Sequence, residues 1–110
     1  MISVSFLTVS GDAARLRGFV SSGHTGIQGK SVLCAAVSSA CYMAVNTLTD
    51  VLMLCPDVTL RDGYMRVALR EEDTEAARVV MQGLRLHLAQ LAEQYPKQIK
   101  ISFSEVQHSC

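Results

Sequence analysis

Hydrophobic and polar residues alternate along the first part of the chain. In residues 2–8, Val4 and Phe6 fall on one face of an extended segment and serines separate them. The turn-forming residues 10–12 follow, and residues 15–21 alternate again. Alternation is typical of strands with one buried face, and a short turn between two such runs favours a hairpin. We therefore predict two antiparallel strands.

The hydrophobic period changes after Ser31. Mostly apolar residues now recur at steps of three and four, which is the spacing of one broad helix face. They are Leu33, Ala36, Val37, Ala40, Ala44, Thr47, Leu48, Val51 and Leu52. Ser31 stands where a helix N-cap is expected. Cys55-Pro56 is expected to end the helix, because proline cannot continue the hydrogen-bond ladder. A helix this long and apolar is predicted to run through the centre of the fold.

Two further apolar runs flank an Asp-Gly pair. Residues 58–60 precede Asp62-Gly63 and residues 64–69 follow it. This is the strongest short-range signal for a β-hairpin. A second amphipathic helix is then predicted to begin at Asp73 and to end before Pro96.

A final alternating run, with Ile99, Ile101 and Phe103 on one face, predicts a last strand. The predicted order is strand, strand, helix, strand, strand, helix, strand (ββαββαβ). This order favours an α+β fold with a mostly antiparallel sheet and two helices packed on one face. The length fits one domain, which we assign to residues 1–110.

Composition and charge narrow the choice of partner. Nearly half of the residues are hydrophobic, and ten basic residues balance ten acidic ones. Proteins that bind nucleic acid through phosphates normally have a basic excess or stripe, so direct nucleic-acid binding is not expected. The N-terminal residues do not resemble a signal peptide, and no apolar run reaches the roughly 18 residues needed to cross a bilayer. We expect a soluble cytoplasmic protein with no membrane contact.

The four cysteines are Cys34, Cys41, Cys55 and Cys110. Their spacing lacks the close pairs and histidine companions of zinc sites, so no metal is expected. Cys34 and Cys41 lie about 10 Å apart along the predicted helix, too far for a disulfide. We expect free thiols in a reducing compartment.

Cys34 is the residue with the clearest chemical potential. It would be the third residue of the helix if Ser31 is the cap. The free N–H groups and positive dipole end at a helix start favour a thiolate over a thiol. A thiolate in this place is a competent nucleophile, and the same N–H groups can stabilise an oxyanion.

His24 is the candidate base for this nucleophile. A short glycine-rich loop that includes Thr25, Gly26 and Gly29 joins it to the helix. If the loop folds back, the imidazole can approach the helix start, and mobile glycines would let the loop open and close over a peptide. The alternative is structural: a free cysteine near a helix start is usually a small core residue, and a single loop histidine usually has no chemical role.

The segment around these two residues carries a family resemblance. Gly23-His24, a short glycine-containing loop and then Val32-Leu33-Cys34-Ala35-Ala36-Val37-Ser38 resemble the signature of the ribosomal-processing cysteine proteases. Asn46 after the motif and the Tyr95, Ile99, Ile101 pattern also fit. The resemblance covers the whole chain in length and element order, and its specific content lies in residues 23–46.

The resemblance implies a function and a set of residue roles. The family removes an N-terminal extension from the precursor of ribosomal large-subunit protein 27, and its members are dimers. Cys34 would then attack the scissile carbonyl and His24 would accept the thiol proton. Ser38, one helical turn beyond Cys34, would support the site through a hydrogen bond. No cofactor is implied, and a homodimer is expected.

The chain departs from the family pattern in two ways. Its loop between His24 and Cys34 is about two residues shorter than usual, and Ser31 replaces the acidic residue that usually lies three positions before the cysteine. Serine can still cap the helix, but it cannot orient an imidazole as a carboxylate does. An alternative is therefore a non-catalytic interaction protein that keeps the protease fold and binds a ribosomal partner. A weaker alternative is a thiol redox sensor.

Overall fold

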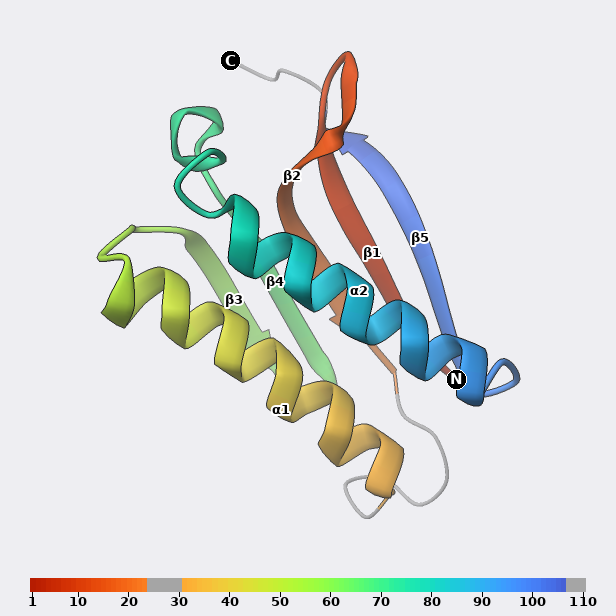
Figure 1. Ribbon diagram of the computed structural model, residues 1–110. Helices are drawn as coiled ribbons and strands as arrows, with labels where there is room; N and C mark the ends of the chain where they lie inside the picture. Colours follow the sequence, from red (N-terminus) through yellow and green to blue (C-terminus); the bar gives the residue numbers. More distant parts are fainter. Residues whose placement is uncertain (24–30, 107–110) are drawn as a thin grey trace.

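The computed structural model describes residues 1–23 and 31–106. Its elements are β1 (Ile2–Val9), β2 (Asp12–Ser22), α1 (Val32–Asn46), β3 (Asp57–Arg61), β4 (Tyr64–Ala68), α2 (Arg78–Gln94) and β5 (Ile99–Val106). Both helices lie across the same face of a single sheet (Figure 1). The predicted α+β class and the order ββαββαβ are confirmed.

The sheet has five strands in the order β3-β4-β2-β1-β5. The pairs β1–β2, β2–β4 and β3–β4 are antiparallel, whereas β5 runs parallel to β1. Gly18 permits the close approach of β2 and β4, because a Cβ at this position would collide with the backbone carbonyl of Val67. The outer positions of the sheet belong to β3 and β5, and the functional surface described below adjoins β3.

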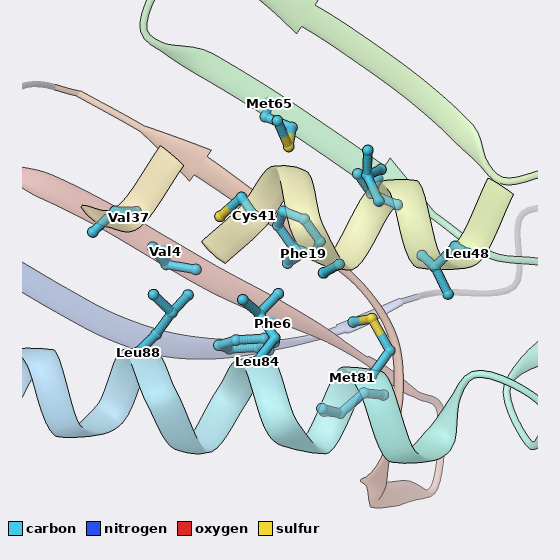
Figure 2. Close-up of a cluster of buried hydrophobic side chains, with 14 of the residues drawn as sticks. Val4, Phe6, Phe19, Val37, Cys41, Leu48, Met65, Met81, Leu84 and Leu88 are labelled. Atoms are coloured by element: carbon cyan, nitrogen blue, oxygen red, sulfur yellow. The ribbon is translucent and has the colours of Figure 1, made fainter. Parts of the chain in front are cut away.

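The core fills the space between the sheet and the two helices. Figure 2 shows that side chains from α1, α2 and the central strands point into this space; those labelled include Val4, Phe6, Phe19, Val37, Cys41, Leu84 and Leu88. The rings of Phe6 and Phe19 lie 6.4 Å apart. With few aromatic residues in the chain, aliphatic side chains and methionines supply most of the packing.

The first helix ends earlier than the sequence predicts. A π-helical turn follows α1 at Thr47–Val51, and Met53 adopts a left-handed conformation with φ 57°. The N–H of Leu54 donates to the carbonyl of Leu48 at 2.8 Å, which closes the chain over the end of the π-helical turn. The expected stop at Cys55-Pro56 is therefore wrong, because a left-handed residue turns the chain out of the helix before the proline is reached.

The second helix begins later than the sequence predicts. Asp73, the predicted start, is the last residue of a short 3-10 helix, and α2 starts at Arg78. The guanidinium of Arg70 donates to the Asp73 carboxylate at 3.0 Å, and the Asp73 N–H donates to the Arg70 carbonyl. These local bonds hold the acidic segment in a tight turn, so it does not act as the first turn of the helix.

The continuous helical segment Val32–Val51 is long and apolar enough to cross a membrane by length and composition alone. Core helices of globular proteins pass the same test. Its buried residues, Leu33, Val37, Cys41, Ala44, Val45 and Leu48, belong to the core cluster beneath the sheet. Val32, Met43 and Val51 are exposed, so one face of the segment packs on the sheet and the other is open. The prediction that this helix runs through the centre of the fold is therefore wrong, as is the prediction that no apolar stretch is long enough to cross a bilayer.

Candidate active site

Cys34 lies in the first turn of α1, and Ser31 caps that turn. The Ser31 backbone is extended, and its Oγ accepts a hydrogen bond from the Cys34 N–H at 3.3 Å. The predicted N-cap is thus confirmed. No described residue accepts a hydrogen bond from the N–H groups of Val32 or Leu33. The helix start therefore offers unpaired donors beside the thiol.

The Cys34 thiol is half-buried at the wall of a hollow of about 270 Å³. Three parts of the fold meet there. The first turns of α1 provide Cys34, Ala35, Val37, Ser38, Cys41 and Tyr42; the β1 and β2 ends provide Ile2, Ser21 and Gly23; and the β3–β4 turn provides Arg61, Asp62, Gly63, Tyr64 and Met65. Apolar and polar groups are mixed in this lining, as in many sites that bind peptides or small molecules.

Ser38 follows Cys34 by one helical turn and lines the same hollow. It is exposed, and its hydroxyl makes no hydrogen bond to another described residue. The predicted shared face of Cys34 and Ser38 is therefore present. The predicted hydrogen bond from Ser38 is not found among the described residues, so its hydroxyl is available to a molecule in the hollow.

Gly23 brings the end of β2 to this hollow. It adopts φ +93°, its N–H donates to the carbonyl of Gly63 at 3.0 Å, and a Cβ here would collide with the carbonyl of Met1. Only glycine fits such a position without strain. Because Gly23 and Cys34 line the same hollow, the chain immediately before His24 lies at the edge of the site. His24, Thr25, Gly26 and Gly29 themselves lie outside the described residues.

Cys41, two turns further along α1, has a different environment. Its side chain is 1% exposed and belongs to the core cluster (Figure 2). Burial raises the pKa of the Cys41 thiol to about 12, although a side-chain hydrogen bond with Ser21 opposes the increase. Cys41 is therefore a neutral packing residue at any physiological pH.

The β3–β4 turn is the part of the site that the sequence analysis missed. The Asp-Gly pair correctly predicts a hairpin there. Nothing local in the sequence indicates that the turn of this hairpin lines the same hollow as Cys34. The Arg61 guanidinium lies 4.2 Å from the centre of the Tyr64 ring, within the range of a cation–π contact. Arg61 makes no ion pair with a described residue. The described residues also contain no group of three or more His, Cys, Asp or Glu that could bind a metal.

Comparisons with known proteins agree with this architecture. Residues 1–100 match the family model described as cysteine protease Prp. A structure of the essential ribosomal processing protease Prp from S. aureus, in complex with a covalently linked product peptide, is similar with a TM-score of 0.83 at 21% identity; the match covers 94% of this chain and 100% of that one. SMU.848 from Streptococcus mutans is similar with a TM-score of 0.79 at 23% identity, over 96% of each chain. No curated protein sequence matches.

Proposed function

Because the chain belongs to the cysteine protease Prp family, we propose that it removes an N-terminal extension from the precursor of ribosomal large-subunit protein 27. Cys34 is the nucleophile and His24 the base in this proposal. The observation that carries it is the position of Cys34 at a capped helix start, on a hollow that also receives the chain just before His24. The similar S. aureus protease has been crystallised with a substrate peptide, which supports a peptide in the corresponding place. A ribosomal substrate also favours the cytoplasm as the compartment.

The proposed reaction has two steps. His24 accepts the proton of the Cys34 thiol, and the sulfur attacks the scissile carbonyl carbon to form a tetrahedral oxyanion. The carbon–nitrogen bond then breaks, the leaving amine takes the proton from His24, and a thioester to Cys34 remains. His24 next removes a proton from water, whose oxygen attacks the thioester. The peptide leaves as a carboxylic acid, and the Cys34 thiol is restored.

Helix α1 supplies the electrostatic support for this reaction. The N–H groups of Val32 and Leu33 have no acceptor among the described residues, and the helix dipole adds partial positive charge at the same end. Both features stabilise the negative charge of the tetrahedral oxyanion. The Cys34 N–H is already bonded to Ser31 Oγ, so its use in an oxyanion hole would require that bond to be exchanged.

The substrate assignment has a direct test. The extended precursor and the same protein without its extension would be incubated with the enzyme, and the products would be weighed by mass spectrometry. We expect a single cut in the precursor and none in the trimmed protein. His24→Asn should slow the cut by about a hundredfold or more, since general base catalysis contributes that much. An intact precursor after prolonged incubation with folded enzyme would refute the substrate.

A homodimer is also proposed. Large hydrophobic side chains are exposed along α1 and the segment that follows it: Val32, Met43, Val51 and Met53. A small domain with a lean core gains stability when a second copy covers such residues. Sedimentation equilibrium at micromolar concentration should give twice the chain mass, and Met43→Asp should shift the protein toward the monomer. A monomer at all concentrations would contradict this.

One feature favours a second function, a non-catalytic binding protein. Ser31 occupies the place of the acid that would orient His24, and its hydroxyl is engaged with the Cys34 N–H. A binding protein would hold the ribosomal partner equally well after Cys34→Ala and would release no product. The protease predicts product formation that Cys34→Ala abolishes.

A further inference from the structure

Strand β3 is an open edge of the sheet that leads directly into the hollow. Among the strands of the described residues it pairs with β4 alone, and it lies at the end of the strand order. Arg61, its last residue, lines the hollow together with Cys34. An edge strand presents unpaired N–H and C=O groups, and an extended peptide can complete them by adding one more strand. The edge and the nucleophile are thus parts of one continuous surface.

The side chains beside this edge are suited to a peptide. Leu60 is 50% exposed and pairs in register with Met65, which lines the hollow. Tyr42 of α1 lines the same hollow and is 46% exposed. Leu60 and Tyr42 are thus exposed apolar side chains at the end of β3 and at the hollow, and we call this pair the apolar shelf; Met65, at 6% exposed, belongs to the core. A shelf of this kind adds side-chain affinity to backbone hydrogen bonds, which are themselves independent of sequence.

The register indicates which β3 groups are available. Arg61 and Tyr64 flank a two-residue turn, and such a flanking pair exchanges both backbone hydrogen bonds. The next positions along an antiparallel ladder alternate. The N–H and C=O groups of Leu60 and Val58 are therefore expected to point away from β4, toward the open edge.

From these features we propose that the substrate peptide binds as an additional strand on β3, with one side chain on the Leu60 and Tyr42 shelf and its scissile bond at Cys34. This inference rests on the proposed protease function, and it names the element that holds and aligns the substrate. β5 forms the opposite edge of the same sheet but contributes no residue to the hollow among those described. Within the described part of the chain, the β3 edge is therefore the one that leads to the hollow lined by Cys34.

The side-chain test compares two matched leucines. Leu60 and Leu86 are almost equally exposed, at 50% and 51%, but Leu86 lies on α2. Leu60→Glu should raise the KM for the extended precursor about fivefold or more, since it removes apolar contact area, and kcat should stay within about twofold. Leu86→Glu should change neither constant. Equal effects of the two variants would overturn the proposal.

The backbone test uses a set of precursor peptides, each with one N-methylated amide, bound to the Cys34→Ala protein and followed by fluorescence anisotropy. Methylation should weaken binding at every second residue on one side of the scissile bond, because alternate N–H groups face the edge. Uniform tolerance of methylation would refute strand addition. Binding to Cys34→Ala is measured without cleavage, so this result is separate from the failure of the protease proposal.

A Leu60→Glu variant that turns a dimer into a monomer with unchanged peptide binding would assign the edge to a second copy and overturn the proposal.

Discussion

Cys34 and Cys41 lie on the same helix, two turns apart, yet their thiols have different chemistry. Cys34 is half-buried in the first turn, beside the Ser31 cap and N–H groups that have no acceptor in residues 1–23 and 31–106. Cys41 is enclosed by the core, and its pKa is raised to about 12. The residue type is the same, and both residues belong to the lining of one hollow. Position along the helix and exposure to solvent therefore decide which cysteine can act as a nucleophile.

The largest expected effect separates the two thiols directly. Cys34→Ala should lower cleavage of the extended precursor by about a thousandfold or more, because the nucleophile is lost. Cys41→Ala should retain activity within about threefold and cost about 1 kcal/mol of unfolding free energy, because it leaves a small void. Initial rates by mass spectrometry and urea unfolding measure both. A Cys34→Ala enzyme that still cuts would transfer the nucleophile to another residue.

The next effect concerns the strand end that leads to His24. Gly23→Ala should cost about 2 kcal/mol or more, since it combines a left-handed φ with a collision against the Met1 carbonyl. Activity should fall further than stability explains, because the chain before His24 would shift away from Cys34. Gly11→Ala is the matched control: Gly11 also has a positive φ, but its Cβ would meet nothing within 4 Å. If both variants cleave at the same rate, Gly23 does not position the site.

These two predictions also show what the sequence could and could not provide. The Ser31 cap and the Cys34 position depend on neighbours within one helical turn, so they could be read from local residues. The hollow lined by both the β3–β4 turn and α1 brings together segments far apart in the chain, and the residues of the turn carry no local signal of this. The three-dimensional structure is therefore needed to assign Arg61, Tyr64 and Tyr42 to the site.

The two helix boundaries were missed for a related reason. Proline at position 56 is a strong stop signal, but the chain leaves the helix at Met53, a residue type that rarely adopts a left-handed conformation. Asp73 is a good helix-start residue, but its carboxylate is bonded to Arg70 in a preceding turn. In both places a specific hydrogen bond overrides the general preference of the residue.

Raising the pH should lower the free energy of unfolding through the Cys41 thiol. The folded pKa of about 12 exceeds the ordinary value of 9.0, so the unfolded chain loses its proton first. The stability that the protonated Cys41 thiol contributes is complete below pH 9 and declines as the pH rises toward 12. At pH 10 the loss is about 1 kcal/mol. Urea unfolding from pH 8 to pH 10.5 should show this decline in the native protein and a smaller one in Cys41→Ala; equal slopes would contradict the assignment.

The smallest expected effect concerns the cap beside Cys34. Ser31→Ala should cost about 1 kcal/mol of stability and reduce the rate severalfold, because the Cys34 N–H loses its acceptor. Ser31→Asp keeps a cap and adds a carboxylate that can orient the imidazole of His24. It should match or exceed the native rate, with folding stability unchanged within about 0.5 kcal/mol. A slower Ser31→Asp enzyme would show that serine is the preferred residue in this site.

The central claim is that Cys34 forms the covalent bond with the substrate. The most direct measurement is to treat the folded protein with a chloromethyl ketone analogue of the precursor's cleavage site and to map the adduct by peptide mass spectrometry. The predicted result is one adduct per chain, on Cys34, with Cys41 and Cys55 unmodified. An adduct on Cys41 or Cys55 would contradict the assignment. So would a rate of Cys34 labelling by the peptide analogue that is no higher than its rate of labelling by iodoacetamide.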